Sequence, residues 1–514
     1  MSRLLLPILC VLFGSADLSA VEPDRQRLLD RPTPGINFAG PKDYATELPL
    51  VDVFKLSRAW ISQRTGAGWG EGPNLDLDQH GYVRRLEPGC YVETPMLTIE
   101  GGRFPTGTYV LLYRGSGTFG FTSGATIRSR SEGRIEVEVD GSRGVRMTIA
   151  DIDPSNYPHD IHFVMPGFES TFRDDPWHPD FLKSWGSMRA FRSMDLQHTN
   201  NSTIRSADDF PRLDDARYTD HGLPLELLAD LANRTGMAWW VCVPHAADDD
   251  AVASMADTIA KHLNPSGVLI VEYSNEVWNR QFAQSKYAAG RGTELKLADK
   301  PWEATWAFTA KRSLEVFEIF QDRFAQDRLI RVLPSQSANP YVGKQIVRFA
   351  GEYAGRPVNQ VADALAIAPY VSMNVKADQA DEVIAMGPDG VMRQLANDAF
   401  EKTAGHIREN ATTAKQNGLA LFAYEAGQHA VGVGPANQNE TLTDMLTAIN
   451  GTPAMGRMYQ RYLKQWADSG GSLICLFSST SRWGRYGSWG LRQYYDETAT
   501  DSPKYDAVLR WNPE

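Results

Sequence analysis

Cysteine is scarce in this chain, with four residues among 514, and the first lies in a short apolar run near the N-terminus. The other three, Cys90, Cys242 and Cys475, are an odd number and lie far apart. A disulfide framework needs cysteines in pairs, and a structural zinc site needs them closely spaced. The spacing therefore predicts neither, and Cys242 and Cys475, which lie inside apolar runs, are interpreted as small core residues.

The chain also lacks an excess of positive charge. Its net charge is −11, and no long block of like charge interrupts it. Nucleic-acid binding needs clustered Lys and Arg, so we expect no nucleic-acid partner. Residues 160–514, where strand-like and helical runs alternate, contain no Gly-x-Gly-x-x-Gly motif, which argues against a dinucleotide-binding fold.

The apolar run near the N-terminus is too short to span a membrane. It extends from Leu4 to Phe13, follows Arg3, and is succeeded by small residues that end at Ala20. This pattern predicts a cleaved secretory signal peptide over residues 1–20. We therefore expect a secreted or periplasmic protein with no membrane span.

Residues 21–159 have the pattern of an antiparallel β domain. Short runs of alternating polar and apolar residues, such as "RIEVEVDG", are separated by Gly-rich turns such as "GGRFPTG". Alternation with period two places one face of each strand in a core. The segment is predicted to form a small β-sandwich that precedes the next domain.

Residues 160–514 alternate between apolar strand-like runs and amphipathic helices, as parallel α/β folds require. The expected strands are "IHFVM", "AFRSMDL", "AWWVCVP", "GVLIVEYSN", "RLIRVLPSQ", "ALAIAPYV", "LALFAYEAG" and "SLICLFSS". Eight strands with helices between them predict a (β/α)8 TIM barrel, and a doubly wound open sheet is the alternative.

Two of these strands end on a carboxylate. Glu276 follows the fourth expected strand and Glu425 the seventh. Active sites of such barrels lie at the C-terminal ends of the strands. Glycoside hydrolysis uses two carboxyl groups, one protonated to assist the leaving oxygen and one ionised. Either residue alone is more simply explained as a helix cap or an ion-pair partner, and the pair is what favours catalysis.

Three stretches around these residues carry a resemblance. "VEYSNEVWN", "YEAGQH" and "GSWGL" resemble the retaining glycoside hydrolases of the 4/7 superfamily, clan A. They are most similar to a poorly characterised group of secreted bacterial cellulase-like or cellulose-binding proteins. The resemblance extends from "GINFAG" to "SPKYDAV", nearly the whole chain after the predicted signal peptide.

The resemblance implies a retaining glycosidase that acts on a β-linked polysaccharide without cofactor or metal, as a monomer. It implies that Glu276 is the acid/base, Glu425 the nucleophile, and Asn275 the partner of the sugar 2-hydroxyl. Ala426 departs from the Gly expected after the nucleophile in many relatives. The resemblance also implies supporting residues. Arg192 and Tyr370 would donate hydrogen bonds to the nucleophile, and His245 would line the site. Trp483 or Trp489 would stack under the sugar.

Several residues have plainer or competing explanations. Glu272 would point into the barrel, so it is interpreted as structural and paired with a buried cation. The segment from Asp76 to Glu87 has the spacing of a calcium loop, but a β-turn is preferred because His80 replaces an acidic ligand. His159 and His162 would lie on opposite faces of a strand and share no metal. The acidic run in "HAADDD" is interpreted as the start of a helix.

Two other functions compete with the glycosidase. One is a carbohydrate-binding protein on a barrel scaffold that has lost catalysis, and the other is a metal-dependent hydrolase, weakened by the missing His-x-His on the first strand. An endo-acting cleft would carry aromatic residues on both sides of the carboxyl pair. The candidates are Trp239, Trp240, Trp302, Trp306 and Trp489.

Overall fold

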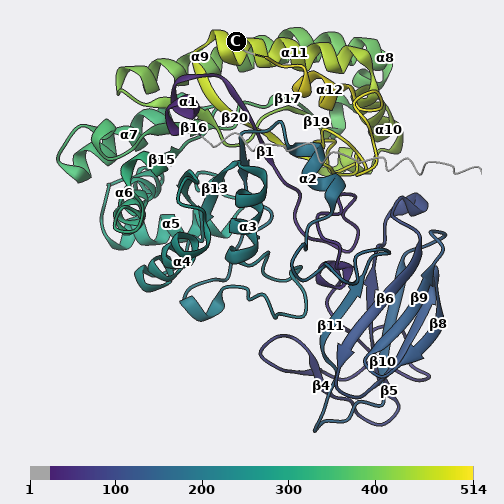
Figure 1. Cartoon of the computed structure of the whole chain (residues 1–514). Helices are drawn as coiled ribbons and strands as arrows, with labels where there is room; N and C mark the ends of the chain where they lie inside the picture. Colours follow the sequence, from purple (N-terminus) through teal and green to yellow (C-terminus); the bar gives the residue numbers. More distant parts are fainter. Residues whose placement is uncertain (1–23, 513–514) are drawn as a thin grey trace, which may run out of the picture.

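The computed structural model describes residues 24–512 of the chain. The predicted signal peptide, residues 1–20, lies outside them. Eight parallel strands close into a barrel, which confirms the predicted TIM-barrel fold (Figure 1). In order around the barrel they are β1 (Thr33–Asn37), β12 (Ala190–Arg192), β13 (Ala238–Val243), β14 (Leu269–Tyr273), β15 (Leu329–Pro334), β16 (Ala364–Ile367), β18 (Ala420–Ala423) and β20 (Gly471–Phe477).

Helices surround the barrel and bury one face each against it. In α11 (Pro453–Asp468), Thr452 caps the first turn, Pro453 occupies its start, and Met455, Tyr459 and Tyr462 face inward. The other helices around the barrel are α2 (Pro179–Trp185), α3 (Leu225–Thr235), α4 (Asp249–His262), α5 (Ala283–Glu294), α6 (Pro301–Gln321), α7 (Pro340–Ala354), α8 (Ala380–Gln394), α9 (Phe400–Gln416), α10 (Glu440–Ala448) and α12 (Pro503–Leu509). Within residues 24–512, no helix combines the length and the apolar character needed to cross a membrane.

The first barrel strand differs from the prediction. The expected strand "IHFVM" belongs to β11 (His159–Val164), which pairs antiparallel with β6 (Gly107–Arg114) outside the barrel. That strand prediction is wrong, and β1 takes its place. β1 contains Pro34 and Gly35, which both disfavour strands. Gly35 is needed there because a Cβ atom would lie 2.7 Å from the Sγ of Cys475 in the neighbouring strand β20.

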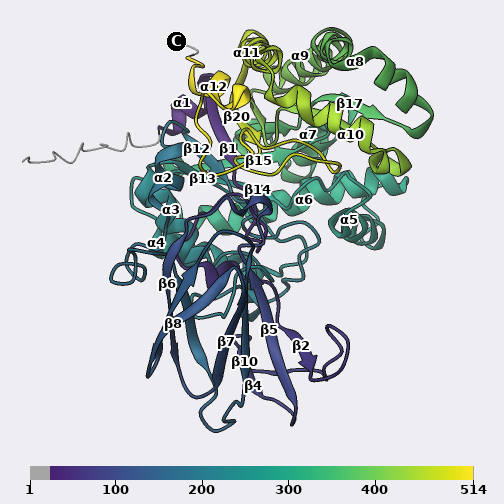
Figure 2. The same ribbon diagram turned by 90° about the vertical axis from the view of Figure 1, so that its right-hand side faces the viewer.

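The β-rich segment is therefore an insertion between the first and second barrel strands. Its two four-stranded sheets share one hydrophobic core, and Figures 1 and 2 show them as a lobe beside the barrel. Residues in β9 (Arg134–Val139) alternate strictly between partly exposed and buried, as the sequence predicts for a sandwich. One sheet consists of β2 (Ile61–Arg64), β5 (Cys90–Met96), β10 (Val145–Ala150) and β7 (Thr118–Ser123), and the other of β11, β6, β9 (Arg134–Val139) and β8 (Ala125–Ser131).

The barrel interior is packed with side chains, so its two ends differ in accessibility. At the N-terminal ends of the strands, the short helix α1 (Arg25–Asp30) inserts Leu28 into the interior cluster. Arg25 fixes this helix through an ion pair with Asp363, at 2.8 Å. The opposite end, where the C-termini of the strands converge, is left for ligands.

Candidate active site

The backbone turns sharply where Glu276 leaves the fourth strand. Ser274 and Glu276 both have positive φ angles, 61° and 40°, which side-chain-bearing residues rarely adopt. Each such residue costs on the order of 1–3 kcal/mol and persists only where its surroundings hold it. Asn275 supplies that hold, because its Oδ1 accepts a bond from Arg192 at 2.8 Å and its carbonyl accepts one from Gln284 at 2.9 Å. The turn therefore presents Glu276 in a fixed position.

Glu425 follows the seventh strand and is held by two donors from other strands. The Tyr370 hydroxyl donates to its Oε2 at 2.9 Å, and Nη1 of Arg192 donates to its Oε1 at 3.2 Å. The sixth barrel strand, β16, is followed by β17 (Val371–Val375), and the seventh, β18, is followed by β19 (Gln428–Gly432). β17 and β19 pair in parallel. This extra pairing keeps Tyr370 beside Glu425.

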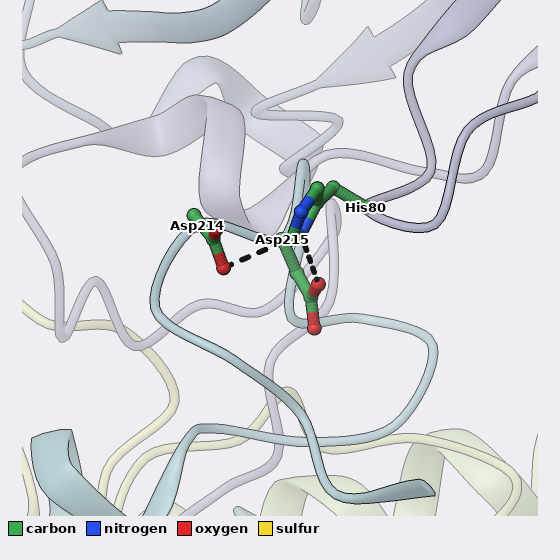
Figure 3. A group of neighbouring side chains, drawn as sticks. All are labelled: His80, Asp214 and Asp215. Carbon is green, nitrogen blue, oxygen red and sulfur yellow. Dashed lines mark hydrogen bonds and ion pairs between the residues drawn. The ribbon is translucent and has the colours of Figure 1, made fainter. Parts of the chain in front are cut away.

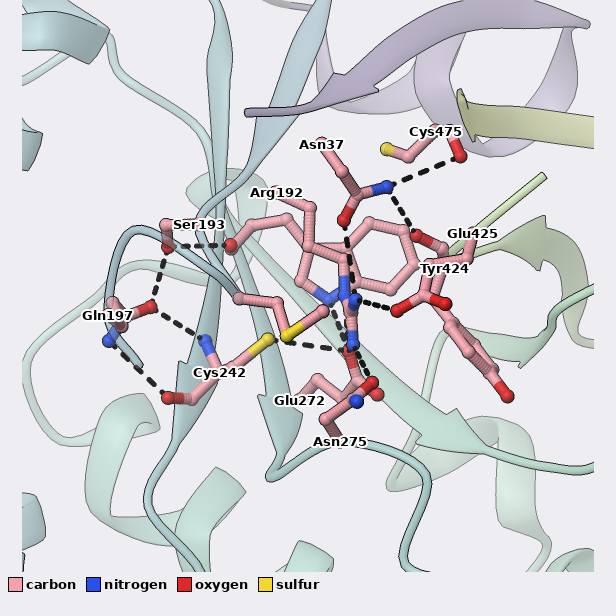
Figure 4. Close-up of polar contacts among 12 residues, drawn as sticks. Asn37, Arg192, Ser193, Gln197, Cys242, Glu272, Asn275, Tyr424, Glu425 and Cys475 are labelled. Atoms are coloured by element: carbon pink, nitrogen blue, oxygen red, sulfur yellow. Dashed lines mark hydrogen bonds and ion pairs between the residues drawn. The ribbon is translucent and has the colours of Figure 1, made fainter. Parts of the chain in front are cut away.

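Arg192 is the centre of the polar network at the barrel mouth (Figure 4). Its side chain is fully buried and donates to four partners, of which two are Glu425 and Asn275. Its Nε donates to Glu272 at 2.9 Å, and its Nη1 also donates to the Asn37 side chain at 3.3 Å. The prediction that Glu272 pairs with a buried cation is confirmed.

The two glutamates of the candidate pair have different electrostatic surroundings. Burial, followed by the negative charge of Glu425, raises the pKa of Glu276 to about 8. Burial also raises the pKa of Glu425, but Arg192 and Tyr370 oppose this effect. Two carboxyl groups that interact this strongly lose their protons in sequence. Glu425 has a cation and a hydroxyl donor, so it ionises first and Glu276 keeps its proton near neutral pH.

The two tryptophans that compete for the stacking role lie in different surroundings. The ring of Trp489 lies 5.7 Å from that of His429, which is in turn 5.8 Å from the Tyr370 ring. Trp483 is buried, donates its indole N–H to the Gly490 carbonyl at 2.9 Å, and has the Lys504 ammonium over its ring. Trp489 thus belongs to the aromatic group beside the carboxyl pair, whereas Trp483 supports the loop that carries it.

His245 lies at the end of β13, as expected, but its contacts lead away from the pair. Its ring meets Tyr287 of α5 edge-on at 5.4 Å, and its carbonyl accepts a bond from Tyr273. Within residues 24–512 its Nδ1 is buried without a hydrogen-bond partner. Burial and the nearby Arg205 lower its pKa to about 4, so the imidazole is neutral near pH 7.

Three residues at the mouth were not identified from the sequence. Asn37 holds Arg192, and the Oδ1 of Asn200 accepts bonds from Asn275 and Gln284 at 2.9 and 2.7 Å. Asp195 lines a pocket of about 450 Å³ with Asn200, and burial and the charge of Glu425 raise its pKa to about 7. Position was an available signal for Asp195 and Asn200, which follow the second strand, whereas Asn37 ends the first strand, which the sequence pattern did not reveal.

The possible calcium loop is a β-hairpin whose carboxylates are already engaged. β3 (Asp76–Leu77) pairs antiparallel with β4 (Val83–Arg85), and the turn closes with a bond from Gly81 N to the Asp78 carbonyl. Asp76 pairs with Arg84, and Glu87 pairs with Arg64. The preferred β-turn interpretation is confirmed.

Other candidate metal ligands have protein partners as well. The Nδ1 of His80 lies 3.3 Å from carboxylate oxygens of both Asp214 and Asp215 (Figure 3). His162 bonds to Asp52 and Asp160, whereas His159 bonds to the Tyr157 carbonyl. The acidic run "DDD" opens α4, with Asp248 as its cap, as predicted.

Comparisons with known proteins extend these observations only to the general fold. No protein-family model matches the chain, and no curated protein matches it. Solved structures that it resembles include a GH51 arabinofuranosidase from Xanthomonas axonopodis pv. citri, at 11% identity and a TM-score of 0.35, over 61% of this chain and 63% of that one. The match thus spans less than two thirds of that enzyme.

Two further solved structures are glycoside hydrolases. A GH5-4 broad specificity endoglucanase from Clostridium acetobutylicum is 10% identical, with a TM-score of 0.37, over 64% of this chain and 89% of that one. A modular endo-beta-1,4-mannanase of family 26 from Cellulomonas fimi is 13% identical, with a TM-score of 0.34, over 63% and 62%. Sequence identities and TM-scores this low assign no function to this chain.

Proposed function

We propose that the protein is a secreted, retaining glycoside hydrolase that cleaves β-glycosidic bonds of a polysaccharide by double displacement. The observation that carries this proposal is the asymmetry of the two glutamates. Glu425 receives bonds from Arg192 and Tyr370, whereas among residues 24–512 no cation is bonded to Glu276, whose pKa is raised to about 8. A retaining glycosidase needs one ionised nucleophile and one protonated acid, and these surroundings support that division.

In the first step, an oxygen of Glu425 attacks the anomeric carbon while Glu276 gives its proton to the departing glycosidic oxygen. The C–O bond to the leaving sugar breaks and a glycosyl ester of Glu425 forms. In the second step, Glu276, now a carboxylate, takes a proton from water, whose oxygen attacks the same carbon and releases Glu425. The two carboxyl groups supply both the nucleophile and the proton, so the proposal requires no cofactor.

Substrate positioning is assigned to groups beside the pair. Asn275 donates one amide hydrogen to Asn200, and within the part of the chain that the structure describes the other has no acceptor and is available for a sugar 2-hydroxyl. Trp489 offers an aromatic face next to Tyr370 for the apolar face of the reacting sugar. Among the aromatic candidates for this role, the position of Trp489 supports it better than that of Trp483.

The roles are tested by removing each carboxyl group and adding azide. Glu425→Ala should abolish turnover, and azide should restore product formation by attacking from the vacated side, giving a glycosyl azide of inverted configuration. Glu276→Ala should slow substrates with poor leaving groups by about 10²–10⁴-fold more than activated aryl glycosides, which need little protonation. There azide attacks the glycosyl ester and gives a product of retained configuration.

Each alternative function predicts a different result. A retained azide product from Glu425→Ala and an inverted one from Glu276→Ala would reverse the assignment of nucleophile and acid/base. Wild-type protein that binds glycans and cleaves none of a panel of plant, algal and bacterial β-glycans would support the binding-protein alternative. Nuclear magnetic resonance of the first-formed anomer distinguishes a retaining from an inverting reaction.

A further inference from the structure

A second pocket, of about 600 Å³, opens at the barrel mouth on the side of Glu276. Its walls include Trp278, two residues after Glu276, and Gln336, which follows the fifth strand, β15. The pocket that contains Asp195 instead lies at the ends of strands one, two and eight. Because the barrel is closed, these two pockets lie on opposite sides of the mouth, with the carboxyl pair between them.

Three tryptophans line this second pocket: Trp278, Trp302 and Trp306. Trp302 lies in the first turn of α6 and is 45% exposed, and Trp306 lies one turn later with its ring edge-on to Tyr341. Trp278 is tied to the catalytic region because its indole N–H donates to the Tyr424 hydroxyl at 3.2 Å. Rigid aromatic walls of this kind suit the apolar faces of sugar rings. By contrast, Trp239 and Trp240 are fully buried in the barrel.

The charged side chains of this pocket are all positive. Arg280 and Lys286 line it, and no Asp or Glu does so. Both are exposed, and within residues 24–512 neither has an ion pair or hydrogen bond from its side chain. In a chain of net charge −11, a pocket with two uncompensated cations and no carboxylate is suited to an anionic ligand.

We propose that this pocket binds the leaving-group part of the glycan and that the sugar bound there carries an anionic substituent, a carboxylate or a sulfate ester. The inference depends on the proposed function, because Glu276, as the acid, must face the leaving oxygen. The tryptophans hold the ring, while Arg280 and Lys286 select its charge. With a pocket on each side of the pair, the glycan extends in both directions and is cleaved internally.

The test uses matched pairs of β-glycans: polymers with uronic acid residues and their carboxyl-reduced forms, and sulfated polymers and their desulfated forms. At low salt, the wild-type protein should cleave the acidic member of one pair about tenfold faster in kcat/KM, and added salt should shrink this preference because exposed charges are screened. The pair that shows the preference distinguishes carboxylate from sulfate.

The double variant Arg280→Met with Lys286→Met should lose the preference for the acidic member. Lys261→Met is the matched control, because Lys261 is an exposed lysine in the last turn of α4, at the other end of the barrel, and this variant should retain the preference. Trp302→Ala should raise KM for long chains and shift the products toward different lengths.

Two outcomes overturn the inference. If neutralised glycans are cleaved as fast as their acidic partners, the glycosidase proposal stands and the anionic pocket is refuted. If no glycan is cleaved, the proposed glycosidase function is refuted. The affinity of the protein for the same matched pairs, measured by calorimetry, then tests whether the pocket binds anionic glycans. Equal affinity for both members, or an affinity for acidic glycans that the double variant keeps, refutes it.

Discussion

Tyr370→Phe removes one hydrogen bond from Glu425 and should move one limb of the pH profile. The hydroxyl of the partly buried Tyr370 donates to Oε2 of the buried Glu425 at 2.9 Å. A hydrogen bond to a charged group contributes about 1.5–3 kcal/mol, and one pKa unit corresponds to about 1.4 kcal/mol. Loss of this donor should therefore raise the pKa of Glu425 by about one to two units.

The measurement is kcat/KM against pH with a glycan whose leaving sugar needs protonation, which reports the pKa values of the free enzyme. Activity needs Glu425 ionised and Glu276 protonated, so it falls at low pH through Glu425 and at high pH through Glu276. In Tyr370→Phe the acid limb should move to higher pH, while the basic limb, at about 8 from the pKa of Glu276, stays. The plateau between the limbs becomes narrower.

A matched control is Tyr109→Phe in the β-rich lobe. Tyr109 is also buried, and its hydroxyl donates to the Pro105 carbonyl at 2.7 Å, far from the carboxyl pair. This variant should leave both limbs in place. An unmoved acid limb in Tyr370→Phe, or a movement of the basic limb instead, would refute the assignment of Glu425 as the group that must be ionised.

Three further predictions concern stability, stacking and metals. Arg192→Met should destabilise the fold by about 3–5 kcal/mol in denaturant unfolding, because it leaves buried carboxylates without their cation. Since burial raises the pKa of Glu272 in the folded state, this loss of stability should be smallest below pH 4 and grow as pH rises. Glu272→Gln in the same variant should recover part of the lost stability. Trp489→Ala should lower kcat/KM about tenfold with little change in melting temperature, whereas Trp483→Ala should lower stability by about 3–5 kcal/mol, as a thermal melt shows. Dialysis against a chelator should leave activity unchanged, and metal-specific recovery of a lost activity would favour the metal-dependent hydrolase instead.

The sequence alone was sufficient to predict the barrel fold and to place the two glutamates at the ends of barrel strands. Parallel strands and the helices between them are encoded by local patterns of apolar residues in the sequence. The rule that strand ends carry the site then selects Glu276 and Glu425, and the same reasoning placed Glu272 inside the barrel beside a cation. These conclusions need only the order and direction of neighbouring residues.

The first strand could not be recognised in this way. β1 is short and contains Pro34 and Gly35, which disfavour strands. It packs into the barrel because Gly35 leaves space for Cys475, a residue far away in the sequence. The run "IHFVM" has the stronger local pattern but belongs to the sandwich. Local propensity therefore favoured the wrong segment, and contacts distant in sequence determined the right one.

The tertiary structure also determined how the site is held and charged. Arg192 reaches Asn37 across 155 positions and Glu425 across 233, and such contacts depend on how the barrel closes and on strand register. The same closure distinguishes Trp489, beside the carboxyl pair, from Trp483, which the loop buries. Residue types and strand ends are local properties that a sequence displays, whereas burial, pairing and pKa values arise only when distant segments pack together.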